Sequence, residues 1–346
     1  MAAPFENREI VLGVTGSIAA YKACEIASRL VDEKARVLPA LTRNALEFVG
    51  RASFEAITGN RAIVEMFEPV PNPEIEHIAV AKRADLFLIA PATANILAKT
   101  AHGIADDWLS TTLLATRAPI LFAPAMNTQM YSHPATQANI ATLKGRGCHF
   151  VGPASGKLAC GEVGKGRLVE TDVILEAAGI LLCHKKDLAG KHVLITSGAN
   201  HEPIDPVRFI ANRSSGKMGR ALALEALRRG AKVTVITGPA RIPLPHGAEV
   251  VAAQTARDMY EAVLDRFDGA DVFISAAAVA DYHVVNVQTE KHKRGKEILP
   301  IELAQNPDIC ATVGQRRRPD QVTVGFAAET SDLVENALDK VLRKNL

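Results

Sequence analysis

The chain lacks the features that define several protein classes. Its five cysteines form no Cys-x-x-Cys pair, and the sequence contains no His-Glu-x-x-His motif. A structural zinc site or a disulfide framework is therefore not expected. The N-terminus has no basic start followed by an apolar run, and no apolar stretch is long enough to span a bilayer. We expect a cytoplasmic protein with reduced thiols and no membrane partner.

The chain also lacks a strong excess of charge. Its 40 basic and 38 acidic residues give a net charge of +2, which argues against general nucleic-acid binding. Two basic runs, at 291–294 and 316–318, are local features. Such runs are usually solvated surface, and nucleic-acid binding through them is the alternative. We expect no nucleic-acid partner.

The length and composition favour two domains. A chain of 346 residues is long for one domain, and 48% hydrophobic residues supply a core for each half. The polar stretch at 185–190 ends in a glycine and precedes a new apolar strand. It predicts a linker between a domain at 1–184 and a domain at 191–346.

Both halves alternate short apolar segments with helical ones. Strands are predicted at 10–14, 37–41, 86–91, 120–124, 192–196, 233–237, 272–276 and 322–326. Helices are predicted at 17–30, 94–101, 107–115, 171–183, 216–229 and 256–267. Strands separated by helices indicate parallel sheets covered on both faces, so we expect two doubly wound, Rossmann-like α/β domains. The charged segment 284–303 breaks this pattern and predicts a hairpin or flap.

Polar motifs follow three strands of the first half. Gly16 and Ser17 lie in a strand–turn–helix segment whose free amides suit a phosphate, although a tight turn is the alternative. The segment lacks the Gly-x-Gly-x-x-Gly spacing of a dinucleotide site. After a later strand, the amide of Asn127 is suited to hold a carboxylate or, alternatively, to cap a helix.

Two further side chains of the first half carry possible chemistry. His77 lies in a helical segment, where a single histidine is more often structural than catalytic. Cys160 is surrounded by glycines at 156, 161, 164 and 166, in a loop too rich in glycine for core packing. We interpret this loop as a mobile flap that carries a proton donor.

Together, the Gly16-Ser17-Ile18 turn, His77, the Pro-x-Met-Asn-x-x-Met segment at 124–130 and the Ala-Cys-Gly flap resemble the flavin-dependent cysteine decarboxylases. The resemblance covers about the first 180 residues and implies a flavodoxin-like flavoprotein domain. It is strongest to the phosphopantothenoylcysteine decarboxylases of coenzyme A biosynthesis. It implies bound FMN contacted by Gly16, Ser17, Ile18 and Thr42. It also implies His77 as the base, Asn127 as the carboxylate anchor and Cys160 as the proton donor. Oxidation of the substrate thiol through FMN makes loss of CO2 feasible.

The second half carries its own polar signature. Asn212 precedes a Ser-Ser-Gly-Lys sequence at 214–217, which is either a ligand-binding loop or an ordinary helix cap. Asp281 follows a strand and is either a ligand for a divalent metal or a turn residue. Lys340 and Lys344 share one helix face and, with Lys291, either clamp a triphosphate or form a solvated surface.

These segments, with those at 204–208, 306–309 and 325–330, resemble the phosphopantothenate–cysteine ligases of the same bifunctional family. The resemblance implies a nucleotide-binding domain that converts phosphopantothenate, CTP and cysteine to an amide through an acyl-CMP. It implies that Asn212 stabilises this intermediate and that Asp281 binds a cation such as Mg²⁺. The implied CTP contacts are Asp281, Lys291, Pro307, Asp308, Ile309, Phe326, Lys340 and Lys344.

The sequence departs from the family at three places. Tyr131 replaces the usual Trp, Gly198-Ala199-Asn200 replaces Gly-Gly-Thr, and the ligase domain is expected to be shortened at Leu346. The family implies a homo-oligomer, a dodecamer of decarboxylase trimers and ligase dimers, with FMN contacted across subunits. A decarboxylase with an impaired ligase half and a non-catalytic regulatory flavoprotein are the alternatives to a bifunctional enzyme.

Overall fold

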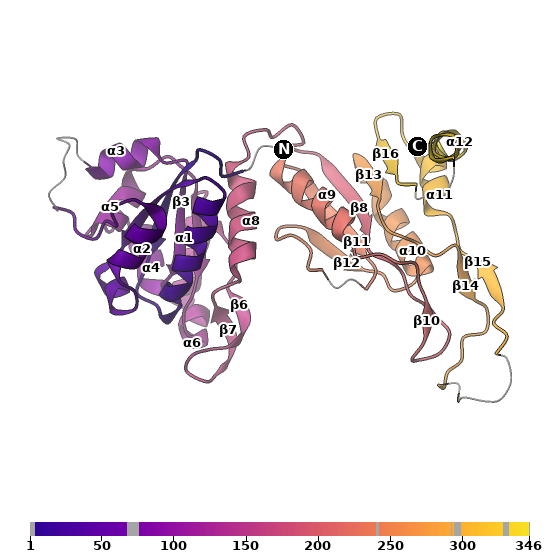
Figure 1. Ribbon diagram of the computed structural model, residues 1–346, viewed down its shortest axis with the longest axis horizontal. Coiled ribbons are helices and arrows are strands. Elements are labelled where there is room, and N and C mark those ends of the chain that lie inside the picture. Colours follow the sequence, from indigo (N-terminus) through magenta and orange to yellow (C-terminus); the bar gives the residue numbers. More distant parts are fainter. Residues whose placement is uncertain are drawn as a thin grey trace. The chain divides into compact units, whose positions relative to one another are not determined.

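The computed structural model describes residues 4–67, 76–239, 242–291, 293, 299–327 and 332–345. The chain divides into two compact units, Met1–His184 and Lys185–Leu346 (Figure 1). Parts of two predicted motifs, His292 with Arg294 and the stretch 328–330, lie outside the described residues. Within the described ranges, no helix is long and apolar enough to cross a membrane.

The N-terminal unit is built on a five-stranded parallel sheet with the order β2-β1-β3-β4-β5. Its strands are β1 (Glu9–Val14), β2 (Arg36–Leu41), β3 (Leu86–Ala92), β4 (Ile120–Pro124) and β5 (His149–Phe150). The four strands predicted in this half are confirmed to within one residue. The order is that of a flavodoxin-like fold, in which the ligand crevice lies at the carboxyl ends of β1 and β3.

Helices cover both faces of this sheet (Figure 1). They are α1 (Lys22–Asp32), α2 (Arg51–Thr58), α3 (Glu76–Arg83), α4 (Ala94–His102), α5 (Trp108–Ala115), α6 (Thr128–Ser132), α7 (Pro134–Gly145) and α8 (Thr171–Leu182), with 3-10 turns at η1 (Ile18–Tyr21) and η2 (Arg43–Glu47). One predicted helix is corrected. The segment 17–30 is not continuous, because Ser17 caps η1 and α1 begins only at Lys22.

Side chains of β1 show how the sheet forms two cores. Ile10, Leu12 and Val14 pack with residues of α1, α2 and α8. Val11 points the other way and packs with residues of α3, α4, α5 and α7. Both faces of the sheet are covered, so a central parallel strand is apolar along its whole length instead of alternating between apolar and polar residues. The sequence of β1 at 10–14 has this continuous apolar pattern.

The glycine-rich segment around Cys160 is a hairpin rather than an irregular loop. Its strands β6 (Ala154–Lys157) and β7 (Val163–Arg167) pair antiparallel, and Cys160 lies in the connection between them. Gly166 permits this hairpin to lie against the end of β4, because a Cβ atom there would come within 2.2 Å of the Met126 carbonyl oxygen. The prediction of a flap is therefore refined to a paired hairpin that carries the thiol at its tip.

The C-terminal unit repeats the architecture with the parallel order β12-β11-β8-β13-β16. Its main elements are β8 (His192–Ser197), α9 (Lys217–Arg228), β11 (Lys232–Thr237), β12 (Glu249–Ala252), α10 (Ala256–Phe267), β13 (Val272–Ser275), α11 (Ile309–Arg316), β16 (Val322–Gly325) and α12 (Leu333–Lys344). One core lies against α10 and α11 and another against α9. The predicted doubly wound fold is confirmed in this half as well.

Two small antiparallel pairs extend from this sheet. They are β9 (Glu202–Pro203) with β10 (Phe209–Ile210), and β14 (Tyr282–Val284) with β15 (Leu303–Gln305). The second pair brackets the segment 284–303, so the ends of that segment meet as the sequence predicts. The middle of the segment, at 292 and 294–298, lies outside the described residues.

Candidate active sites

The carboxyl ends of β1 and β3 are joined by one buried hydroxyl. Thr15 is 2% exposed, and its Oγ1 donates to the Pro91 carbonyl oxygen at 2.7 Å. The same Oγ1 accepts from the Thr93 amide at 3.1 Å. Thr93 in turn caps α4 through the Ile96 amide. This network fixes the two strand ends at the position where the fold places its ligand.

The turn after β1 comes unusually close to the loop after β2. A Cβ atom on Gly16 would lie 2.6 Å from the Cβ of Asn44, so only glycine fits. Thr42 is held at this edge by its amide, which donates to the Val14 carbonyl oxygen at 3.0 Å. Gly16, Thr42 and Asn44 line a pocket of about 780 Å³. The buried Trp108 also lines it, and its Nε1 has no partner among the described residues.

A neighbouring pocket of about 620 Å³ shares Gly16 and Thr93 with the first. It brings together Ser17, Ile18, Asn127 and Cys160, which come from the ends of β1 and β4 and from the hairpin. With Gly16, the structure thus places five of the predicted residues of this half in one cavity. Its size is typical of a small-molecule site.

The Asn127 side chain makes contacts in two directions. Its Oδ1 accepts from the Gln129 amide at 2.8 Å and so caps α6. Its Nδ2 donates to a Glu162 carboxylate oxygen at 2.9 Å and lies 3.6 Å from Cys160 Sγ. The structure therefore shows the predicted helix cap, and the Nδ2 group that would hold a ligand carboxylate contacts Glu162 instead.

The tip of the hairpin is a tight turn that presents an exposed thiol. The Leu158 amide donates to the Glu162 carbonyl oxygen at 2.8 Å, and the Gly161 amide donates to the Leu158 carbonyl oxygen at 2.9 Å. Gly161 has φ +88°, a conformation that favours glycine. At the hairpin base, Lys165 Nζ lies 5.4 Å above the ring of Tyr131, so tyrosine supplies an aromatic surface there.

His77 is not part of this cavity. It lies half-buried on α3, near that helix's N-terminus, and lines neither of the two pockets described for this unit. The structure of one chain therefore does not bring His77 to Asn127 and Cys160.

Sequence reasoning missed three residues at this site. Glu162 lies on the hairpin beside Cys160, Trp108 faces the first pocket, and Lys22 lines the second. Only Glu162 had a signal, since it stands two residues after the cysteine in the same motif. Lys22 and Trp108 begin helices and reach the pockets only through the packing of the sheet.

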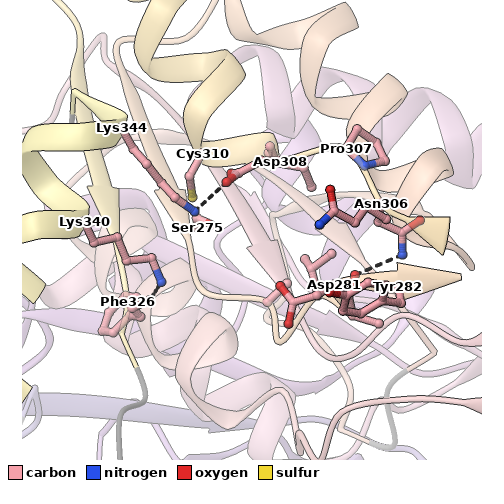
Figure 2. A pocket seen from close by; sticks show the side chains of 15 residues that line it. Ser275, Asp281, Tyr282, Asn306, Pro307, Asp308, Cys310, Phe326, Lys340 and Lys344 are labelled. Atoms are coloured by element: carbon pink, nitrogen blue, oxygen red, sulfur yellow. Dashed lines mark hydrogen bonds and ion pairs between the residues drawn. The ribbon is translucent and has the colours of Figure 1, made fainter. Parts of the chain in front are cut away.

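The C-terminal unit has a pocket of about 500 Å³ at the ends of β13 and β14 and the N-terminus of α11 (Figure 2). Seven of the predicted nucleotide contacts line it: Asp281, Pro307, Asp308, Ile309, Phe326, Lys340 and Lys344. Figure 2 shows both lysines extending from α12 toward the cavity. The i, i+4 spacing therefore places them on one side, facing the pocket.

Asp308 occupies a central position in this pocket. Its Oδ1 accepts from the Ala311 amide at 2.9 Å and caps α11, and its Oδ2 forms an ion pair with Lys344 Nζ at 2.6 Å. Burial acts to raise the pKa of the Asp308 carboxyl. The bonds from Lys344 and the Ala311 amide, with the charges of Lys344 and Lys340, outweigh it and hold the pKa below its usual value. Lys340 donates instead to the Phe326 carbonyl oxygen at 3.2 Å.

Two predicted residues lie outside the lining of this pocket. Asn212 is connected to it, because its Nδ2 donates at 2.8 Å to the carbonyl oxygen of Val279, a lining residue. Lys291 is exposed between β14 and β15 and is not among the described lining residues. Within the described part of the chain, no three His, Cys, Asp or Glu side chains form a metal-binding group, and Asp281 is the predicted ligand that faces the cavity.

A buried polar cluster supports the loop behind this pocket. Asn200 is fully buried; its Nδ2 donates to Glu202, and its Oδ1 accepts from the Ala280 amide at 2.7 Å. Ala199, which replaces a glycine of the family, does not have a positive φ and forms a parallel bridge with Ala278. The neighbouring Gly198 has φ +77°. The backbone therefore needs glycine at 198 but not at 199.

Two family models together span nearly the whole chain. The model described as "Flavoprotein" matches residues 3–179, and the model described as "DNA/pantothenate metabolism flavoprotein C-terminal domain" matches residues 188–346. The coenzyme A biosynthesis bifunctional protein CoaBC of Bacillus subtilis is 45% identical over 98% of this chain and 84% of its own length. The same protein of Mycobacterium tuberculosis is 46% identical over 94% of this chain and 80% of its own length.

Solved structures also match parts of the chain. The C-terminal domain of a CoaBC protein is 41% identical and covers 46% of this chain and 76% of its own, with a TM-score of 0.41. The FMN-dependent cysteine decarboxylase SpaF is 33% identical and covers 52% of this chain and 99% of its own, with a TM-score of 0.46.

The fold and the sites define a two-domain α/β protein with a flavoprotein domain followed by a pantothenate-metabolism domain, each with a pocket at the ends of its parallel strands. The thiol-bearing hairpin belongs to the first domain and the lysine-lined pocket to the second. The chain belongs to the family of coenzyme A biosynthesis bifunctional proteins.

Proposed function

We propose that the protein catalyses two steps of coenzyme A biosynthesis in series. The domain at 191–346 joins 4′-phosphopantothenate to cysteine at the expense of CTP, and the domain at 1–184 decarboxylates the product to 4′-phosphopantetheine. Membership in the bifunctional family supports both activities. Two separate pockets, each with its own polar residues, agree with two reactions on one chain.

One observation carries the decarboxylase assignment. The Asn127 amide lies within reach of the Cys160 thiol and is already bonded to a carboxylate, that of Glu162. A substrate carboxylate held by the same amide would lie next to the thiol. Loss of CO2 leaves a carbanion on the carbon that carried the carboxylate, so Cys160 is well placed to protonate it.

The residues present suit a flavin in the first pocket. The turn at Gly16 lines this pocket, and Trp108 Nε1, which has no partner among the described residues, offers a hydrogen-bond donor there. Gly16, Ser17, Ile18 and Thr42 are the residues proposed to hold FMN. When bound, FMN supplies a reversible two-electron exchange with the substrate thiol.

The hairpin performs the remaining steps with its own residues. It covers the second pocket, lowers the access of water and presents Cys160 to the substrate. His77 is proposed as the base, and because it lies outside this cavity it would act on substrate bound by a neighbouring copy. We therefore propose a homo-oligomer, with decarboxylase trimers joined through ligase dimers into a dodecamer.

The ligase assignment rests on the pocket in Figure 2. Lys340, Lys344 and Lys291 are proposed to bind the phosphates of CTP, and Asp281 a divalent cation that neutralises the leaving group. Pro307, Asp308, Ile309 and Phe326 would surround the nucleotide. Asn212 is proposed to stabilise the acyl-CMP intermediate, which the cysteine amine then attacks.

One experiment tests both activities on the flavin-loaded full chain. CO2 release is measured from phosphopantothenoylcysteine, and pyrophosphate release is measured from CTP with phosphopantothenate and cysteine. We expect both. Pyrophosphate release without CO2 release would disprove the decarboxylase activity. CO2 release without pyrophosphate release would leave a decarboxylase alone. Bound flavin with neither product would leave a non-catalytic flavoprotein.

A further inference from the structure

The backbone that leaves β13 toward the nucleotide pocket is held by hydrogen bonds at alternate residues. The Ala276 amide donates to the Thr196 carbonyl oxygen at 3.2 Å, and the Ala278 amide donates to the Gly198 carbonyl oxygen at 2.8 Å. This spacing continues the parallel ladder between β8 and β13 beyond the end of both strands. It leads directly to residues 279–281, which line the pocket.

A buried side chain makes the next step of this ladder. Gly198 has φ +77°, which ends the extended course of the chain after β8. Two residues further along the facing segment, the Ala280 amide donates to a side-chain oxygen, Asn200 Oδ1, at 2.7 Å. Asn200 is fully buried and is not among the described residues that line the pocket. It therefore reaches the pocket through the backbone of Ala280.

The orientation of the Asn200 amide group is fixed from the side away from Ala280. Its Nδ2 donates to the Glu202 carboxylate, whose Oε1 also accepts from the Ala256 amide at 2.8 Å. Ala256 is the first residue of α10, where the helix dipole favours a carboxylate. Because Glu202 Oε1 is the acceptor in both hydrogen bonds, the NH2 group of Asn200 must face it and the carbonyl oxygen must face Ala280.

The segment that Asn200 holds is connected to two groups of the proposed ligase. Asn212 Nδ2 donates at 2.8 Å to a carbonyl oxygen of this segment, and Asp281 directly follows Ala280. The Ala280 carbonyl oxygen accepts from Asn306 Nδ2 at 2.9 Å. Asp281 and Asn306 both line the pocket (Figure 2). Ala280 is thus held through its N–H group by Asn200 and through its carbonyl oxygen by Asn306.

We propose that Asn200 is a positioning residue of the ligase: through the Ala280 amide, it keeps the segment 279–281 in the geometry that acyl-CMP formation requires. The inference rests on the proposed ligase function. The phosphates of CTP are proposed to bind lysines of α12, whose contacts with Phe326 and Asp308 do not involve this segment. Loss of the Asn200 hydrogen bond should therefore lower kcat and leave KM for CTP nearly unchanged.

The test compares two substitutions of nearly equal size in the full chain. Asn200→Leu removes the acceptor for the Ala280 amide, whereas Asn200→Asp keeps it, with a proton shared between the new carboxyl group and Glu202. Pyrophosphate release from CTP, with phosphopantothenate and cysteine, measures kcat and KM. Asn200→Leu should lower kcat by roughly tenfold to a hundredfold, because displaced catalytic groups have effects of this size. Asn200→Asp should retain most of kcat.

Two further measurements separate positioning from stability. Both variants disturb the buried contact with Glu202, so both should lower the urea concentration at which the C-terminal half unfolds. Amide hydrogen exchange at residues 276–282 should become faster in Asn200→Leu alone, since only this variant leaves the Ala280 amide without its acceptor. Asn200→Ser, whose hydroxyl group is one bond shorter than the amide, replaces Asn200→Leu if that variant does not fold.

Thr234→Val is the matched control for the loss of a buried hydrogen bond. Thr234 is buried on β11, and its Oγ1 donates to Glu249 at 3.1 Å, outside the described lining of the pocket. This variant should lower the stability of the C-terminal half without a change in kcat or in KM for CTP.

Three results would overturn the positioning role. Equal losses of kcat in Asn200→Leu and Asn200→Asp would mean that activity follows stability alone. An unchanged kcat in Asn200→Leu would show that the remaining hydrogen bonds suffice to hold the segment. A rise in KM for CTP with kcat unchanged would assign Asn200 to nucleotide binding. A wild type that releases no pyrophosphate would instead refute the proposed ligase, and the positioning role with it.

Discussion

In both halves of the chain, a lysine that lines the pocket is paired with a carboxylate at the N-terminus of a helix. In the C-terminal half Asp308 pairs with Lys344 and also caps α11 through the Ala311 amide. In the N-terminal half Glu170 pairs with Lys22 but makes no side-chain cap on α8. Asp308 therefore both lines its pocket and caps a helix, whereas Glu170 caps no helix through its side chain and is not among the residues that line the pocket.

The difference indicates how each pocket can change on binding. A phosphate that approaches Lys344 competes with a carboxylate that the Ala311 amide holds in place. Lys22 instead faces a carboxylate that is two-thirds exposed and that pairs more closely with Arg167. We expect a substitution of Asp308 to lower the free energy of unfolding more than a substitution of Glu170 does, because only Asp308 caps a helix through its side chain.

The largest expected effect separates the two halves completely. Cys160→Ser removes the proposed proton donor, so the rate at which 4′-phosphopantetheine is formed should fall by about 10²- to 10⁴-fold. CTP-dependent pyrophosphate release by the same protein should not change. The variant is expected to stop at an oxidised, decarboxylated intermediate detectable by mass spectrometry. Normal turnover by Cys160→Ser would show that another group donates the proton.

The next effect concerns the nucleotide pocket. Lys344→Met removes a phosphate contact and leaves Asp308 without its ion pair, so KM for CTP should rise by about tenfold or more. Steady-state pyrophosphate release measures this. Arg343→Met is the control, because the neighbouring Arg343 is exposed and pairs with Asp339 on its own helix. A rise in KM for CTP of the same size in Arg343→Met would mean that only the general charge of α12 matters.

A paired comparison of stability tests the distinction directly. Asp308→Ala removes a helix cap and should lower the free energy of unfolding by about 0.5–2 kcal/mol. Glu170→Ala removes an exposed carboxylate and should lower it by less than about 1 kcal/mol. Urea unfolding, followed by a probe in each half, measures both. Equal losses would mean that the helix cap of Asp308 adds no more to stability than the exposed ion pairs of Glu170 do.

The pH dependence of stability provides a further comparison. Asp107 caps α5 through Ser110 and pairs with Lys99; although burial acts to raise its pKa, these bonds lower it. The stabilisation from Asp107 is therefore complete above the ordinary carboxyl pKa of about 3.9, and is lost as the pH falls through the lower folded value. Asp107→Asn should destabilise the N-terminal half at neutral pH and reduce its loss of stability between neutral and acidic pH.

Unfolding free energies of the wild type and Asp107→Asn, measured from neutral to acidic pH, test this. Asp172→Asn is the control, since Asp172 is exposed and pairs with Arg29 on the surface. A parallel decline in the wild type and Asp107→Asn would place the acid sensitivity elsewhere.

The smallest expected effect concerns the hairpin. Glu162→Gln weakens the carboxylate that competes for the Asn127 amide, so KM for the decarboxylase substrate should fall by less than about fivefold, as suits an exposed contact. The kcat value should remain within the same range. A rise in KM would indicate that Glu162 helps to bind the substrate rather than competing with it.

The sequence alone predicted most of the architecture. Apolar strands such as β4 and β13 were recognised because a buried parallel strand is apolar on both faces, and α10 was recognised as a helical segment between two such strands. The hairpin β6–β7 was interpreted as a loop, since its glycines have little strand propensity. Its pairing depends on contact with the end of β4, which lies far away in the sequence.

The candidate sites divide in the same way. Local motifs identified Cys160 and Asn127, and the structure places them 3.6 Å apart across 33 residues. The spacing of Lys340 and Lys344 identified the lysines of α12, but it did not predict that Lys344 pairs with Asp308. Glu202 illustrates the limit: it is buried and bonds the Ala256 amide, 54 residues away, and no local pattern specifies that partner.

By itself, the sequence determined two doubly wound domains, the polar residues at the strand ends and the family to which they belong. These follow from periodicity and from short motifs, whose physical causes act within a few residues. The tertiary structure alone decided which charges meet: Lys22 with Glu170, Lys344 with Asp308, and Asn127 with Glu162. Such pairs form only when packing brings distant segments within a few ångströms, the range over which hydrogen bonds and partly buried charges interact.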